Sequence, residues 1–170
     1  HQLVLIGLQG EELQAKETPP SNLVFLIDVS GSMQSANKLS LLKSAFRLLV
    51  QQLQPEEKVS IVTYAGSAGL VLDSASGDET QKILSAIDRL QAGGSTAGGQ
   101  GIKLAYKVAK ENFIEGGNNR VILATDGDFN VGVSSDAAMT RLIEEKREEG
   151  IFITVLGFGT GNYKDSKMEK

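Results

Sequence analysis

The stretch NLVFLIDVSGSM, residues 22–33, decides the fold of this 170-residue chain. Its first part, Asn22–Asp28, is apolar almost without alternation, which is typical of a strand buried on both faces of a parallel sheet. The strand ends in the carboxylate of Asp28, and two hydroxyls follow at alternate positions, Ser30 and Ser32. A cap for a turn or a helix needs only one such side chain, so the other two call for a further explanation.

Strand-like and helix-like segments alternate after this stretch. A helix is predicted over residues 37–55, where apolar residues recur at steps of three and four: Leu39, Leu42, Phe46, Leu49 and Leu53. Asp78 and Gln81 are spaced as a capping box that opens a second helix. Two more helices are expected, at roughly Gly101–Phe113 and after a cap at Ser135 or Asp136.

Further strands are predicted at Lys58–Gly66, Val121–Gly127 and Ile151–Gly159, with a short edge strand at Leu70–Asp73. Strands that alternate with helix-length crossovers predict an α/β fold: an open, doubly wound, mostly parallel sheet with helices on both faces.

The length suits one domain, residues 22–170, preceded by an N-terminal strand and connector in residues 1–21. The strand is predicted at Leu3–Gly10, and the polar connector ends in Pro19–Pro20. Because the chain begins at His1 rather than Met, we expect a fragment, with any signal peptide or anchor outside it.

The composition excludes several functions. With 17 basic and 21 acidic residues the net charge is −4, which argues against nucleic-acid binding. No apolar run approaches the roughly 18 residues of a transmembrane segment. The chain has no cysteine, and its single histidine is His1, so thiol nucleophiles, cysteine–zinc sites and a Ser–His–Asp triad are excluded.

The predicted sheet brings oxygen-bearing side chains to one edge, since ligands of such folds bind at the carboxyl ends of strands. Asp126 ends a second buried strand, and a glycine-rich loop offers Thr96, with Ser95 as an alternative. Carboxylates and hydroxyls suit a hard cation, Mg²⁺ first, with Mn²⁺ or Ca²⁺ as alternatives. The candidate metal ligands are Asp28, Ser30, Ser32, Thr96 and Asp126.

These elements resemble the von Willebrand factor type A domain, which is also found as the integrin I domain. The metal-ion-dependent adhesion site (MIDAS) of that family is Asp-x-Ser-x-Ser after the first core strand, a Thr in a middle loop and an Asp after a later strand. The matching residues here are Asp28–Ser32 in DVSGSM, Thr96 in GGSTAGG and Asp126 in ATDGD. The sequences of these motifs are most similar to those of bacterial members, and the resemblance covers the chain from about Asn22.

The resemblance implies an intact MIDAS in which Ser30 and Ser32 bond the metal directly. It implies that Thr96 bonds directly when a ligand is bound, and that the two aspartates act directly or through water. One position is left for an exposed Asp or Glu of a protein partner. The implied function is metal-dependent protein binding in adhesion or assembly, without enzymatic activity. The family usually adds a helix and often a strand after IFITVLGFG, so the chain is expected to be truncated there, which leaves regulation by a C-terminal helix open.

Two alternatives remain at this stage. A haloacid-dehalogenase-like, Mg²⁺-dependent phosphotransferase also places an Asp after its first strand, but that chemistry needs a second acid where Ser30 stands. The chain could also be a structural domain with a vestigial metal site. The partner's identity, the oligomeric state and the compartment stay open, with the cell envelope or the exterior favoured.

Overall fold

The computed structural model of the protein describes residues 18–65, 67–93, 98–127 and 136–158. The strands are β1 (Ser21–Asp28), β2 (Lys58–Ala65), β3 (Ser67–Ser76), β4 (Asn118–Thr125) and β5 (Ile151–Gly157). The helices are α1 (Leu41–Val50), α2 (Thr80–Asp88), α3 (Gly98–Glu111) and α4 (Asp136–Glu148). A 3₁₀ turn at Gly31–Gln34 and a π-helical turn at Ala36–Ser40 join β1 to α1.

The strands form one sheet in the order β3-β2-β1-β4-β5. Strand β1 pairs in parallel with both β2 and β4, β5 adds in parallel to β4, and β3 alone is antiparallel. The chain builds outward from β1 on one side through β2 and β3, and then returns to the other side through β4 and β5. The predicted doubly wound, mostly parallel sheet is therefore confirmed, with its switch point between β1 and β4.

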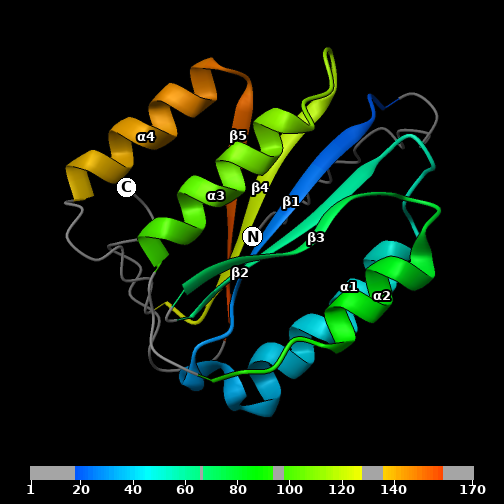
Figure 1. Ribbon diagram of the computed structural model, residues 1–170, viewed down its shortest axis with the longest axis vertical. Helices are drawn as coiled ribbons and strands as arrows, with labels where there is room; N and C mark the ends of the chain where they lie inside the picture. Colours follow the sequence, from blue (N-terminus) through cyan, green and yellow to red (C-terminus); the bar gives the residue numbers. More distant parts are fainter. Residues whose placement is uncertain (1–17, 66, 94–97, 128–135, 159–170) are drawn as a thin grey trace, which may run out of the picture.

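Helices cover both faces of this sheet, with α1 and α2 on one and α3 and α4 on the other (Figure 1). Alternate residues of β1 enter two separate cores. Phe25 packs edge-on against Phe46 of α1, with ring centroids 4.3 Å apart. Leu26, on the opposite face, packs in the cluster of α3 that contains Ile102. Burial on both faces explains why the β1 sequence is apolar without alternation.

Some details differ from the sequence-based expectations. The edge strand is β3, as predicted, but it runs for ten residues rather than four because it pairs with almost all of β2. The prediction of a capping box at Asp78 and Gln81 is wrong. The residue before α2 is Glu79, and no side-chain cap bond forms there, because the Glu79 carboxylate instead accepts from the Ser76 backbone N–H.

Several expectations fall outside the described residues: the strand at Leu3–Gly10, the Ser95 and Thr96 loop, the Ser135 cap and the chain beyond Phe158. The expected division into residues 1–21 and 22–170 and the truncation at the C-terminus stay predictions. Within the described ranges, none of the helices combines the length and apolar character needed to cross a bilayer.

Candidate metal centre

Two carboxylates meet at the carboxyl ends of the neighbouring strands β1 and β4. Asp28 is the last residue of β1, and Asp126 follows the last residue of β4 directly. The register pairs Ile27 with Ala124, so the two strands end side by side. Asp28 is fully buried and Asp126 is 2% exposed. The fold thus places both acids at the switch point, where ligands of such sheets bind.

Three donors hold the Asp28 carboxylate. Its Oδ1 accepts from the backbone N–H of Ser30 at 2.8 Å, which closes a turn of the Asx type. Its Oδ2 accepts from the Tyr64 hydroxyl at 3.1 Å and from the Thr125 hydroxyl at 3.4 Å. Tyr64 is placed to do so because it stands opposite Asp28 in the β1–β2 register. The orientation of Asp28 is therefore set by three elements of the chain.

Burial dominates the ionisation of Asp28. Removal from water raises the pKa of Asp28, and the neighbouring charge of Asp126 adds to the rise, although the Ser30 and Tyr64 hydrogen bonds oppose it. Burial, together with the charge of Asp28, also raises the pKa of Tyr64 far above its ordinary value. Tyr64 hence stays a protonated donor to Asp28 at all ordinary pH values.

The two serine hydroxyls lie next to each other. Ser30 Oγ and Ser32 Oγ are 2.9 Å apart and share a hydrogen bond. Ser30 is buried, while Ser32 is exposed. The chain turns between them into a 3₁₀ helix, which begins with the bond from Met33 N–H to Ser30 C=O. Met33 is fully buried and packs inward, so it adds no apolar rim to the site.

Asp126 has a charged partner that the sequence did not suggest. The ammonium of Lys38 lies 2.8 Å from Asp126 Oδ2 and 3.1 Å from the carbonyl oxygen of Ser32. The turn after Asp126 needs a left-handed residue, and Gly127 supplies it with φ = +94°. In the sequence, Lys38 is only one of several basic residues that interrupt the apolar series of the predicted helix.

The glycine-rich loop begins beside these residues. The Gly93 N–H donates to Val29 C=O at 2.7 Å, which joins the chain before that loop to the segment between Asp28 and Ser30. On its other side the loop leads into α3, where Gly101 packs against Tyr64. Thr96 itself lies outside the described residues, so its membership of the site stays a prediction.

The side-chain atoms brought together here that could bind a metal are all oxygens. In the described ranges, no three His, Cys, Asp or Glu side chains gather into one group. A cation at this edge thus needs hydroxyls as well as the two carboxylates. The adjacent hydroxyls of Ser30 and Ser32, beside the carboxylates of Asp28 and Asp126, fit the preference of hard cations for oxygen ligands.

Sequence reasoning missed the residues that support this set. Tyr64 and Thr125 lie in strands that read only as β-branched and apolar, and Lys38 carries no motif. A signal existed for Tyr64 alone, because parallel pairing of β1 and β2 that ends at Asp28 brings it opposite that residue.

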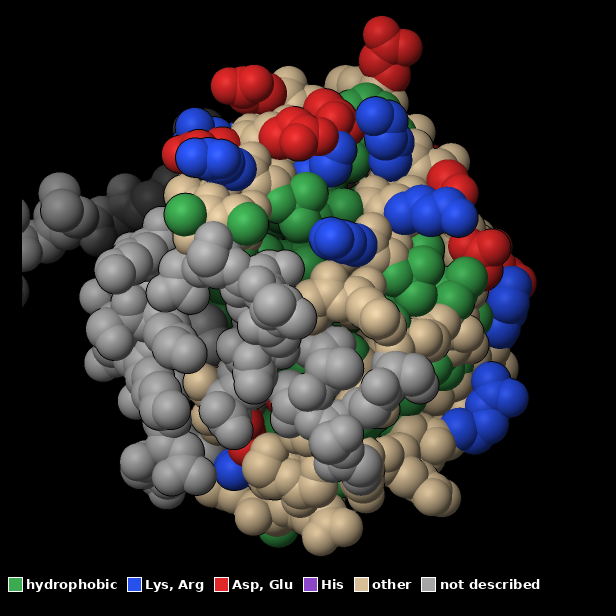
Figure 2. All heavy atoms as spheres, turned by 60° about the vertical axis from the view of Figure 1, so that its left-hand side comes forward, with side chains coloured by type: hydrophobic (Ala, Val, Ile, Leu, Met, Phe, Trp, Pro, Cys, Tyr) green, Lys and Arg blue, Asp and Glu red, His purple; other side chains and the backbone are tan. Residues whose placement is uncertain are grey.

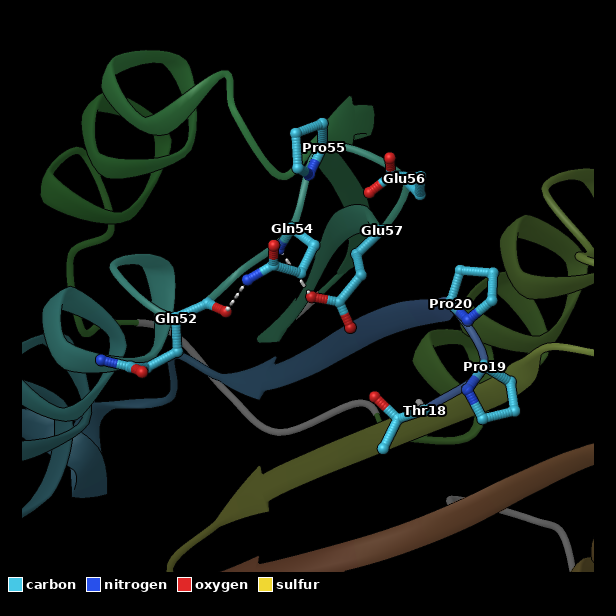
Figure 3. A pocket seen from close by; sticks show the side chains of 8 residues that line it. All are labelled: Thr18, Pro19, Pro20, Gln52, Gln54, Pro55, Glu56 and Glu57. Atoms are coloured by element: carbon cyan, nitrogen blue, oxygen red, sulfur yellow. Dashed lines mark hydrogen bonds between the residues drawn. The ribbon is translucent and has the colours of Figure 1, made fainter. Parts of the chain in front are cut away.

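A separate hollow of about 600 Å³ lies at the opposite end of the strands, where β1 and β2 begin (Figure 3). Its walls are Thr18, Pro19, Pro20, Gln52, Gln54, Pro55, Glu56 and Glu57. On one of these walls the Gln54 N–H donates to the Glu57 carboxylate at 2.9 Å (Figure 3). Although this hollow is large, it lies at the amino ends of the strands, away from the switch-point crevice.

The surface over α3 and α4 carries basic and acidic side chains interspersed (Figure 2). Within the described part of that face, neither sign forms a continuous area. The footprint expected for a nucleic-acid backbone, a basic stripe, is thus missing from this described surface.

The family of the chain follows from its similarity to known proteins. The family model for the von Willebrand factor type A domain matches residues 23–128, and the chain belongs to this family. It is 44% identical over 166 residues to the uncharacterized protein YfbK of Escherichia coli strain K12, covering 98% of this chain and 29% of that protein. It is 31% identical over 151 residues to a UPF0353 protein of Mycolicibacterium gilvum, covering 81% of this chain and 44% of that protein. The chain therefore spans less than half the length of either relative.

Solved structures show the same fold. A von Willebrand factor type A protein from Catenulispora acidiphila superimposes with a TM-score of 0.71 at 22% identity, over 89% of this chain and 36% of that chain. Proximal thread matrix protein 1 from the mussel byssus, with a zinc-occupied MIDAS motif, gives a TM-score of 0.66 at 26% identity, over 89% and 38%.

Proposed function

We propose that this domain is a protein-binding module that docks an acidic side chain of a partner on a divalent cation. The cation is held by Asp28, Ser30, Ser32, Thr96 and Asp126, which form the MIDAS of the chain. Mg²⁺ is the proposed resident metal, with Mn²⁺ or Ca²⁺ as alternatives.

One observation carries this proposal: two buried carboxylates converge with two adjacent serine hydroxyls at the switch-point edge. Burying two carboxylates side by side costs free energy, and among the described residues Lys38 supplies a counter-charge to Asp126 but not to Asp28. The raised pKa of Asp28 reflects that cost. A bound divalent cation offsets it, which is a physical reason for such an arrangement to exist.

The cation would supply a positive charge that a partner's carboxylate can bind. The residues of this chain do the rest. Tyr64, Thr125 and the Ser30 N–H orient Asp28. Their hydrogen bonds replace those that the Asp28 carboxylate would otherwise accept from water. The hydroxyls of Ser30 and Ser32 ligate without charge, so they leave the metal electrophilic toward an acidic partner.

The comparisons support this reading in part. Membership of the von Willebrand factor type A family favours a role in protein interaction or assembly rather than in catalysis. The mussel protein with zinc in its MIDAS motif supports a divalent cation at the corresponding edge of this fold. No described residue around Asp28 provides a separate general base, and Ser30 stands where a phosphotransferase would need an acid. We therefore expect no phosphatase turnover.

Titration calorimetry with Mn²⁺ tests the metal site. Wild type should bind one equivalent, and Asp28→Ala should lose binding. Asp73→Ala is the matched control, because Asp73 is an exposed acid on β3. Equal Mn²⁺ affinity in wild type and Asp28→Ala would show that the site is wrongly assigned.

Docking is tested with immobilised domain and an extract of the source cells. Proteins retained in Mg²⁺, released by EDTA and absent from the Asp28→Ala column are the expected partners. Replacing the exposed acids of such a partner with Ala, one at a time, should identify one whose loss abolishes binding. Retention that EDTA does not change would place the interaction surface elsewhere.

A further inference from the structure

We propose that Lys38 is a built-in competitor of the metal: its ammonium neutralises Asp126, and a divalent cation must displace it or share that carboxylate with it. This inference rests on the proposed function, since it concerns the same site. Its consequence is that metal alone binds weakly, and that the partner's carboxylate completes the charge balance.

The geometry that supports this is a buried, doubly anchored ion pair. Lys38 Nζ donates to Asp126 Oδ2 at 2.8 Å, and the two side chains are only 11% and 2% exposed. The same ammonium donates to the carbonyl oxygen of Ser32 at 3.1 Å. The other ion pairs of the described residues are more exposed, for example Arg47 with Asp88 at 49% and 52% exposure. Lys38 alone among them is directed into the candidate site.

The local backbone accounts for this placement. Lys38 lies in the π-helical turn Ala36–Ser40, between the 3₁₀ turn that carries Ser32 and the start of α1. Such wide turns are rare in proteins, and those that occur are often found at functional sites. The ammonium thereby touches both halves of the proposed MIDAS, the serine segment after β1 and the acid after β4.

The formal charges give the consequence. Asp28, Asp126 and Lys38 together carry one net negative charge when all are ionised. A divalent cation turns this into one net positive charge, in a region where charges are poorly screened because the carboxylates are buried. A partner carboxylate then brings the total to zero. Metal without partner is thus disfavoured by Lys38, whereas metal with partner is not.

Removing the ammonium should therefore tighten metal binding. We expect Lys38→Met and Lys38→Gln to bind Mn²⁺ at least about tenfold more tightly than wild type in titration calorimetry, because no cation competes for Asp126. Lys43→Met is the matched control. Lys43 lies on α1 and donates to the carbonyls of Asp88 and Leu90, away from the site residues, so its loss should leave the affinity within about twofold.

Thermal melting gives a second readout. In EDTA, both Lys38 variants should melt below wild type, because the buried Asp126 loses its counter-charge, and saturating Mn²⁺ should raise their melting temperature by more than it raises that of wild type. Lys38→Gln retains a hydrogen-bond donor, which keeps the test usable if Lys38→Met fails to fold.

The outcomes separate the two ideas. Tighter Mn²⁺ binding by the Lys38 variants supports the inference, including the case in which only the variants bind measurably. If wild type binds Mn²⁺ and both Lys38 variants bind it with the same or lower affinity, the competitor role is overturned and the proposed function stands. Absence of Mn²⁺ binding in wild type and in both variants refutes the metal site and the competitor role together.

Discussion

Two buried tyrosines, one with a hydrogen-bonded hydroxyl and one without, give a sharp test of how Asp28 is held. The Tyr64 side chain is fully buried, and its hydroxyl donates to Asp28 Oδ2 at 3.1 Å. Tyr106 on α3 is 2% exposed, and its hydroxyl has no hydrogen-bond partner among the described residues. Replacing each with Phe removes one buried oxygen atom and leaves the ring, so the pair separates the polar contacts of the Tyr64 hydroxyl, which involve Asp28 and Thr125, from packing.

The expected magnitudes differ. A hydrogen bond to a charged group contributes about 1.5–3 kcal/mol, so Tyr64→Phe should lower the free energy of unfolding by that amount. For a domain of this size this corresponds to a fall in melting temperature of about 3–12 °C. The bond through Thr125 at 3.4 Å is long and cannot replace it fully. Tyr106→Phe removes an unpaired buried hydroxyl, so its stability should stay within about 0.5 kcal/mol of wild type or rise.

Urea unfolding in EDTA, followed by far-UV circular dichroism, measures both variants under conditions where no metal contributes. The slope of the transition has to match that of wild type for the comparison to hold. If Tyr64→Phe is as stable as wild type, or if Tyr106→Phe loses as much as Tyr64→Phe, then the Tyr64 hydroxyl does not hold Asp28 and the reasoning fails.

Three further predictions concern the core and the buried acid. Phe46→Ala should lower the free energy of unfolding by about 3–5 kcal/mol in urea, because it empties the contact with Phe25; a loss under 1 kcal/mol would contradict the packing. Gly101→Ala should destabilise the domain by about 1–3 kcal/mol, since a Cβ there would lie 2.9 Å from Tyr64 Cβ, whereas Gly93→Ala, with open space around it, should be neutral in the same assay. Asp28→Asn should melt higher than wild type at neutral pH in EDTA. Folding raises the pKa of Asp28 above 3.8, so the stability carried by its protonated form is complete below that pH and is lost as pH rises through the folded-state pKa. The two melting curves should converge near pH 4, and a constant difference across pH would count against the raised pKa.

Much of the fold follows from local pattern. The unbroken apolar run of β1 requires burial on both faces. The three- and four-residue spacing of Leu39, Leu42 and Phe46 requires a helical segment with one buried side, and the π-helical turn and α1 together provide it. The contact between Ser30 and Asp28 is also local, because a carboxylate readily accepts from the N–H two residues on. Strand length and capping were less accessible: β3 extends because β2 offers it partners, and the spacing of Asp78 and Gln81 occurs without the cap.

The sequence by itself determined the family resemblance and the two acids at strand ends, because these depend on residues close together or on burial alone. Only the tertiary structure decided what those acids touch. Tyr64 reaches Asp28 across 36 positions, and Lys38 reaches Asp126 across 88. Periodicity records whether a side chain faces the core, but the partner of a polar group depends on which strands are neighbours, in which register, and on the turn that precedes α1. That is why Lys38 reads as an ordinary surface lysine in the sequence and lies against the buried carboxylate of Asp126 in the folded chain.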